Sequence, residues 1–155
     1  MKNYQSLVDE ALARVPEIMP WDLRERLEQP EPPILLDVRE PEEYAAMHIP
    51  GSLNIPRGIL EPSVEWGFDE TEPRLAAARD EEIVVICRSG RRSALAARTL
   101  QELGFERVQS LKLGVRGWND DEAPLEDTGG NRVDPDEAEE HLRVKVRAEQ
   151  MGPKA

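Results

Sequence analysis

The chain lacks several features that define whole classes of protein. Its 155 residues include one cysteine, Cys87, so no disulfide can form within the chain. That cysteine and two histidines also offer no four-ligand spacing for a structural zinc site, and we expect neither a metal nor a cofactor. The longest apolar run, Ile83 to Cys87, is far shorter than the roughly 20 residues of a transmembrane helix. The first residues lack the basic start and apolar stretch of a signal peptide, so we expect a cytoplasmic protein.

Positive charge is also scarce. Aspartate and glutamate number 32 against 20 lysines and arginines, which gives a formal net charge of −12. A chain this acidic repels nucleic acid phosphates and anionic membrane surfaces, so neither is expected as a partner. The length suits one domain with a single core.

The apolar pattern predicts an α/β domain. Apolar residues spaced for one helix face between Tyr4 and Val15 predict a helix ended by Pro16, and a short helix should follow from Pro20 to about Glu28, burying Trp21. Strands are expected at 34–38, 52–55, 82–87 and 107–111, with helices starting near 41, over 74–79 and over 93–103, and an irregular loop over 57–72. Strands that alternate with helices indicate a mainly parallel sheet with helices on both faces.

Charge composition predicts how the chain is divided. Residues 119–140 hold ten acids and one base, which marks a change from the preceding segment. We therefore expect an N-terminal helix over 1–18, a compact domain over 19–128 and an acidic tail over 129–155 that is either helical or disordered. A solvated surface is the simpler role for this tail, and docking of a partner is the alternative.

Cys87 stands where chemistry is expected. It ends the strongest predicted strand, just before a loop and a helix, and ligands of open α/β sheets bind beyond the carboxyl ends of strands. Arg88, Arg91 and Arg92 follow within five residues, although the chain as a whole is acidic. Gly90 lets the loop turn so that its amides converge on the sulfur, and amides and cations together favour a reactive thiolate. A buried core cysteine beside a solvated loop is the alternative, but it leaves the clustered arginines unexplained.

Four motifs in order resemble the single-domain rhodaneses, the thiosulfate sulfurtransferases. They are the Cys87–Ser93 loop (CRSGRRS), Tyr44–Gly51 (YAAMHIPG), Asp37–Glu40 (DVRE) and Leu113–Trp118 (LGVRGW). Their spacing agrees across about residues 19 to 125. Three residues depart from the family pattern: Met47 and Leu113 replace usual glycines, and Ser52 replaces a usual alanine.

The resemblance implies a fold, a five-stranded rhodanese-like sheet, and a mechanism. Cys87 would attack the outer sulfur of thiosulfate, release sulfite and carry the sulfur as a persulfide to cyanide, a thiol or a sulfur-carrier protein. The substrate-binding residues would be those of the loop: Arg88, Ser89, Gly90, Arg91, Arg92 and Ser93. Loop amides and Arg92 would stabilise developing charge, while Arg88 and Arg91 would attract the anionic donor.

Two other functions stay open. Cysteine phosphatases and arsenate reductases also place a cysteine at a strand end before an arginine and a helix, but phosphatases separate the two residues by five positions. Here four residues separate Cys87 from Arg92, a loop better suited to one sulfur atom than to a phosphate. A non-catalytic binding module is the other alternative, although inactive relatives usually lose the cysteine.

Supporting roles are expected for residues outside the loop. Asp37 and Arg39 could touch the loop, but an ion pair that braces it is the favoured interpretation. His48 is expected to hold a turn by a hydrogen bond rather than to act as a base. Trp118 is expected in the core, whereas Trp66 and Phe68 could either wall the mouth of the site or pack in the core.

Overall fold

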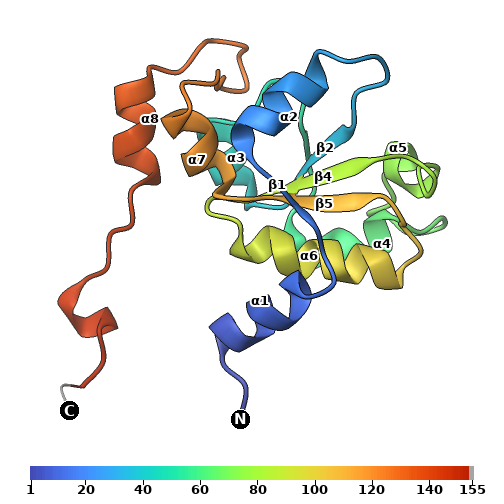
Figure 1. The fold of residues 1–155 in the computed structure, drawn as a ribbon, viewed down its shortest axis with the longest axis horizontal. Coiled ribbons are helices and arrows are strands. Elements are labelled where there is room, and N and C mark those ends of the chain that lie inside the picture. Colours follow the sequence, from blue (N-terminus) through green and yellow to red (C-terminus); the bar gives the residue numbers. More distant parts are fainter. Residues whose placement is uncertain (154–155) are drawn as a thin grey trace.

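The computed structural model describes residues 1–153, and its centre is a sheet of five parallel strands (Figure 1). The strand order is β1-β5-β4-β2-β3, and every neighbouring pair is parallel. The strands are β1 (Glu17–Ile18), β2 (Ile34–Asp37), β3 (Leu53–Asn54), β4 (Ile83–Ile86) and β5 (Val108–Leu111). The α/β architecture with a five-stranded sheet and helices on both faces is thus confirmed, and the described strands are all parallel rather than mainly so.

Helices connect the strands and cover both faces of the sheet (Figure 1). The α-helices are α1 (Tyr4–Leu12), α2 (Pro20–Leu27), α3 (Pro41–Ala46), α4 (Leu60–Ser63), α5 (Pro73–Ala76), α6 (Arg91–Glu102), α7 (Gly114–Asp120) and α8 (Pro135–Leu142). Two 3₁₀ turns, Arg57–Ile59 and Ala148–Gln150, complete the regular structure of the described residues. Among those residues, no helix is both long and apolar enough to span a bilayer.

Successive side chains of β4 point to opposite faces of the sheet, so the core has two layers. Ile83, Val85 and Cys87 face one layer, where α4, α5 and α6 pack against the sheet. Val84 and Ile86 face the other, where α2, α7 and α8 pack. Because β4 is apolar on both faces, it occupies the centre of the sheet, as parallel strands covered on both sides do.

The strand order reverses direction between β4 and β2, which is called a topological switch point. The chain leaves β4 through α6 toward β5, on one side, and leaves β2 through α3 toward β3, on the other. Connections that run in opposite directions open a crevice at the carboxyl ends of the two adjacent strands. Asp37 pairs with Ile86 in register, so the residues after both strands, including Cys87, meet at this crevice.

The terminal helices pack onto this core from opposite sides. Val8 and Ala11 of α1 are buried against Ala94 on the outer side of α6. Ala138 and Leu142 of α8 are buried in the layer that contains α7. The tail therefore includes an ordered helix with an apolar contact, while the division of the chain at 18 and 128 stays a prediction.

Several local predictions were wrong. The segment 57–72 is not wholly irregular, because Leu60 and Val64 are buried and hold the short helix α4. Helix α6 begins at Arg91, two residues before its predicted start. Strand β1 was not predicted, because two residues are too few to show an alternating apolar pattern. Trp21 is exposed rather than buried, since α2 turns it away from Leu23. The exposed side chains of Trp66 and Phe68 lie outside the core, and Trp118 is buried as predicted.

Candidate active site

Cys87 follows β4 directly, and its side chain is buried under the first turn of α6. The turn between them is short because Gly90, the N-cap of α6, adopts a left-handed conformation with φ +98°. A Cβ at Gly90 would also lie 3.3 Å from backbone atoms of Leu111 and Leu113. Glycine thus satisfies both the conformation and the close approach that bring the helix start over the sulfur.

Two backbone amides of this helix start point at the sulfur. The N–H groups of Gly90 and Ser93 donate to Cys87 Sγ at 3.1 and 3.2 Å. The Ser93 hydroxyl lies 3.3 Å from Sγ and 2.8 Å from the hydroxyl of Ser110 on β5. The thiol can donate to Ser93 Oγ, and the thiolate can accept from it. Both amides belong to the N-terminus of a helix, where the backbone presents donors to a negatively charged group.

Helix α7 holds the Cys87 loop from its other side. The N–H groups of Val115 and Arg116 donate to the carbonyls of Cys87 and Arg88, at 2.9 and 3.0 Å. Any side chain at Gly114 would collide with those same carbonyls. The left-handed residue before it is Leu113, with φ +69°, at one of the positions where this sequence departs from the family pattern.

The three arginines of the loop take different surroundings. Arg92 forms a bidentate ion pair with Glu43 of α3, with N–O distances of 2.8 and 2.9 Å. Arg91 is exposed and donates to Gln5 of α1 at 3.2 Å. Arg88 is half-buried and lines a cleft beside the C-terminal tail.

The Glu43–Arg92 pair has a clear electrostatic effect. Burial alone would raise the pKa of Glu43, but hydrogen bonds from Arg92 and the Glu40 backbone, with the charges of Arg92 and Arg39, lower it to about 2. The hydrogen bonds to Glu43 raise the pKa of Arg92, and the negative charge of a Cys87 thiolate contributes in the same direction. The charge of Arg92 therefore lies within electrostatic range of the sulfur even though its guanidinium contacts Glu43.

Asp37 and Arg39 form a buried ion pair at the end of β2. Arg39 Nη2 lies 2.8 Å from the Asp37 carboxylate and donates to the Met47 carbonyl at 2.7 Å. Asn54, which the sequence analysis missed, donates to the carbonyls of Asp37 and Arg39, both at 3.0 Å. The buried charges are therefore compensated, and the network joins the end of β2 to the turn after α3.

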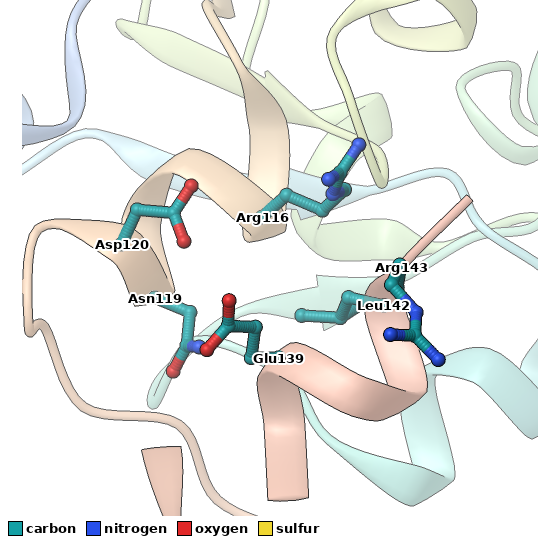
Figure 2. A pocket seen from close by; sticks show the side chains of 6 residues that line it. All are labelled: Arg116, Asn119, Asp120, Glu139, Leu142 and Arg143. Atoms are coloured by element: carbon teal, nitrogen blue, oxygen red, sulfur yellow. The ribbon is translucent and has the colours of Figure 1, made fainter. Parts of the chain in front are cut away.

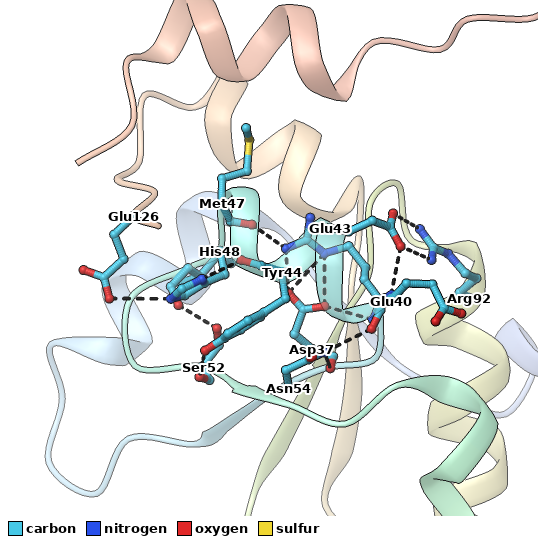
Figure 3. Close-up of polar contacts among 12 residues, drawn as sticks. Asp37, Glu40, Glu43, Tyr44, Met47, His48, Ser52, Asn54, Arg92 and Glu126 are labelled. Atoms are coloured by element: carbon cyan, nitrogen blue, oxygen red, sulfur yellow. Dashed lines mark hydrogen bonds and ion pairs between the residues drawn. The ribbon is translucent and has the colours of Figure 1, made fainter. Parts of the chain in front are cut away.

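His48 holds the turn after α3. Its ring stacks on Tyr44 with centroids 3.8 Å apart, and its Nδ1 lies 2.8 Å from the Tyr44 carbonyl (Figure 3). Its backbone pairs with Glu126 in an isolated antiparallel bridge, and its Nε2 lies 3.7 Å from that carboxylate. None of these contacts involves Cys87, so the geometry is that of a bracing residue.

Sequence reasoning missed Glu43 as the partner of Arg92, Ser110 as the partner of Ser93, and the need for glycine at Gly114. Ser110 lies in β5, where two of the four residues (VQSL) are polar, so the sequence does not mark its hydroxyl as a partner of Ser93. No spacing rule signals Glu43, which lies 49 residues before Arg92. Among the described residues, no group of three or more His, Cys, Asp and Glu side chains could hold a metal ion.

A buried cysteine between a parallel strand and a helix N-terminus, with two amides donating to its sulfur, is the centre of the candidate site. The rhodanese-like domain family matches residues 19–121, and the chain belongs to this family.

Proteins similar to the chain carry sulfur-transfer names. It is 38% identical over 109 residues to YrkF of Bacillus subtilis, which is named as a sulfur carrier protein; the match covers 70% of this chain and 54% of YrkF. It is 32% identical over 104 residues to a protein of Allochromatium vinosum named sulfurtransferase, covering 67% and 88% of the two chains. The chain thus spans only about half the length of YrkF, and 22% of the Aspergillus terreus adenylyltransferase and sulfurtransferase.

Solved structures include both a sulfurtransferase and a phosphatase suggestion. A human single-domain sulfurtransferase is 29% identical with a TM-score of 0.60, covering 68% of this chain and 96% of that one. A Rhodopseudomonas palustris protein of unknown function, described as a possible tyrosine phosphatase, is 28% identical with a TM-score of 0.74, covering 81% and 96%. The comparisons therefore establish the family and leave the reaction to be argued from the site.

Proposed function

We propose that the protein is a sulfurtransferase that moves a sulfane sulfur from thiosulfate, or from a persulfide donor, through a persulfide on Cys87. The observation that carries this proposal is the pair of amides, from Gly90 and Ser93, that donate to the sulfur at 3.1 and 3.2 Å. A thiolate held in this way is a nucleophile that needs no general base. This agrees with the position of His48, which contacts Tyr44 and Glu126 rather than the thiol.

The reaction has two displacement steps. The Cys87 thiolate attacks the outer sulfur of thiosulfate, the sulfur–sulfur bond of the donor breaks, and its electron pair leaves with sulfite. An acceptor nucleophile then attacks the outer sulfur of the persulfide and releases the Cys87 thiolate. Cyanide accepts the sulfur in an assay, and a thiol or a sulfur-carrier protein accepts it in the cell; the name of YrkF supports the latter class.

The loop residues supply the electrostatics of both steps. The Gly90 and Ser93 amides stabilise the persulfide and the departing sulfite because they already face the sulfur, where charge develops. The charge of Arg92 adds to this at longer range, since its guanidinium is bound to Glu43. Arg88 and Arg91 attract the anionic donor. Asp37, Arg39 and His48 hold the surrounding turns in place. A lone free thiol suits the reducing cytoplasm, where we place the reaction.

The phosphatase alternative has a specific argument against it in the loop. With Arg91 and Arg92 already in the first turn of α6, only residues 88–90 form the turn, and the Arg92 guanidinium is bound to Glu43. A phosphoryl group needs donors around three oxygens, whereas a persulfide needs them around one sulfur.

Steady-state assays test the proposal. We expect thiosulfate:cyanide sulfurtransfer in the wild-type protein, its loss in Cys87→Ser, and negligible hydrolysis of p-nitrophenyl phosphate by either. Robust phosphatase activity that disappears in Cys87→Ser would select the alternative. An absence of both activities in the folded protein would favour a binding module.

A further inference from the structure

A cleft with a basic lining lies between the active-site loop and the C-terminal tail. Its volume is about 470 Å³, and its lining includes Arg88, Arg143, Lys145 and the imidazole of His141. Val144 and Val146 add an apolar wall and are among the exposed large apolar residues of the chain. We call this the basic cleft. Its volume falls within the range of roughly 300–1,000 Å³ that is usual for small-molecule sites.

The basic cleft is positively charged, whereas the molecule as a whole is negatively charged. Three permanent cations meet there in a chain whose formal net charge is −12, and its described lining includes no carboxylate. Arg143 does pair with Glu140 at 2.7 Å, but both side chains are about 60% exposed. Such exposed pairs contribute little free energy, so a ligand can recruit the guanidinium. A concentration of positive charge of this kind suits an anionic ligand.

Packing at the base of the tail holds α8 against the rest of the domain. Ala138 and Leu142 of α8 are buried in the core layer that contains Trp118 of α7. Arg143, the next residue, also borders a smaller cavity of about 140 Å³ between α7 and α8. Figure 2 shows Arg116 and Arg143 on one side of that cavity and the carboxylates on the other.

Backbone hydrogen bonds link α7 to the loop that follows Cys87. The N–H of Arg116 donates to the carbonyl of Arg88, the residue that follows Cys87. In Figure 1 the tail runs down the side of the molecule on which β4 and β5 end. Helix α7 thus joins both walls of the basic cleft, and Arg88 belongs at once to this cleft and to the loop that holds the sulfur.

We propose that the basic cleft binds the carboxylates of a small anionic thiol, which accepts the sulfur from Cys87. The inference rests on the proposed sulfurtransfer and adds the chemical class of the acceptor. The acceptor thiolate attacks the outer persulfide sulfur, the bond from that sulfur to Cys87 Sγ breaks, and Cys87 leaves as the thiolate, so no oxidant or reductant is required. Arg143 and Lys145 determine specificity for the acceptor's charge, and the two valines contact its carbon skeleton.

The test compares two acceptors on protein that already carries the persulfide. Protein loaded with thiosulfate and freed of excess donor is mixed with mercaptosuccinate, which has two carboxylates, or with uncharged 2-mercaptoethanol. Mass spectrometry follows loss of the persulfide. In Arg143→Gln/Lys145→Gln, we expect the rate ratio of mercaptosuccinate to 2-mercaptoethanol to fall about tenfold relative to wild type. Differences in intrinsic thiol reactivity cancel because the same two thiols are compared throughout.

A charge-matched control separates the basic cleft from net charge. Arg74 and Arg107 line another cavity at the opposite end of the strands, with Glu82 at the start of β4. Arg74→Gln/Arg107→Gln changes the total charge equally and should leave the ratio as in wild type. An unchanged ratio in the cleft variant, or an equal fall in the control, would overturn the proposal. Thermal unfolding midpoints verify that both variants fold.

A binding experiment distinguishes this inference from the proposed function. Calorimetry with Cys87→Ser should detect mercaptosuccinate, and the signal should disappear when Arg143→Gln and Lys145→Gln are added. If wild-type protein never forms a persulfide but this binding pattern holds, the sulfurtransfer proposal fails and the basic cleft stands as an anion site. If the persulfide forms and Cys87→Ser protein binds no mercaptosuccinate, the basic cleft proposal fails alone.

Discussion

At the scale of the residue, the chemistry of Cys87 depends on the few atoms that touch its sulfur. Two are backbone amides, which truncating a side chain does not remove, and the third is the hydroxyl of Ser93. Ser110, 2.8 Å away, can donate to Ser93 Oγ and so leave the Ser93 proton for the sulfur. This relay orients a hydrogen bond toward the charged form of the nucleophile.

Ser93→Ala should lower kcat/KM for thiosulfate about tenfold. A hydrogen bond to a charged group contributes about 1.5 kcal/mol, which corresponds to roughly that factor. Ser63→Ala is the matched control, because Ser63 is buried and hydrogen-bonded to the Leu60 carbonyl in another part of the core. Equal losses in both variants, measured as initial rates of thiocyanate formation, would show that the effect is not specific to the sulfur.

Leu113 carries backbone strain next to the active-site loop. It adopts φ +69°, and its side chain lies over Gly117. Leu113→Ala keeps a Cβ in this conformation, whereas Leu113→Gly removes it. We therefore expect the glycine variant to be more stable than the alanine variant by about 1 kcal/mol in urea unfolding, the opposite of the order in most of a chain. An alanine variant as stable as the glycine variant would contradict the strain.

Residues differ in how far the sequence could predict them. Cys87 and Gly90 stood out because a lone cysteine and a glycine follow a β-branched strand. The family resemblance flagged position 113, but only the backbone shows that the leucine there is left-handed. No spacing rule states which distant residue a long side chain will contact, so the pairing of Arg92 with Glu43 was missed.

At the scale of the element, one ion pair ties α3 to α6. Glu43 is in the first turn of α3, and Arg92 is in the first turn of α6. The side chain of Glu43 also accepts from the backbone of Glu40, so the same carboxylate caps its own helix. The two helices that flank the switch point are therefore held together at their N-terminal ends, beside the sulfur.

The stability that this pair provides should depend on pH. Glu43 has an ordinary pKa of 4.5 and a pKa of about 2 in the folded protein. Its contribution is therefore complete above about pH 4.5 and is lost as the pH falls from there to about 2. The urea midpoint of Glu43→Gln should lie below that of wild type at pH 7, and the difference between the two midpoints should be smaller at pH 3.

The control for this prediction is an exposed pair on another helix. Glu61 pairs with Arg57 at 3.0 Å and is half exposed. Glu61→Gln should hardly change the midpoint at either pH, because such pairs contribute little. A gap for Glu43→Gln of the same size at pH 7 and pH 3 would show that the carboxylate charge is not what stabilises the contact.

Elements with several apolar residues were predictable, and shorter ones were not. The central strand and the helix after it carry enough periodic residues to define their type, and errors at their ends are of one or two positions. β1 has two residues, and it exists because Glu17 and Ile18 pair with Ser110 and Leu111, a contact made by tertiary structure alone.

At the scale of the whole molecule, the acidic tail contributes to the fold as well as to charge. Leu142 is 3% exposed and packs in the layer with Trp118 and Leu125. The charged residues of α8 face solvent, and they dominated the sequence, which left helix and disorder as alternatives for this segment. Two apolar residues at a spacing of four decide the matter in the structure.

Leu142→Ala should destabilise the protein by about 2–5 kcal/mol, the usual range for a truncated buried leucine. Val144→Ala, two residues later and about half exposed, should change stability by less than about 0.5 kcal/mol. Urea unfolding measures both. If the two variants matched wild type equally, α8 would not be part of the cooperative fold.

The most direct test of the central claim is mass spectrometry of the intact protein after incubation with thiosulfate. The account predicts a gain of one sulfur atom, located on Cys87, reversed by cyanide and absent in Cys87→Ser. A folded wild-type protein that gains no sulfur under conditions in which its thiol is alkylated normally would contradict the sulfurtransfer mechanism.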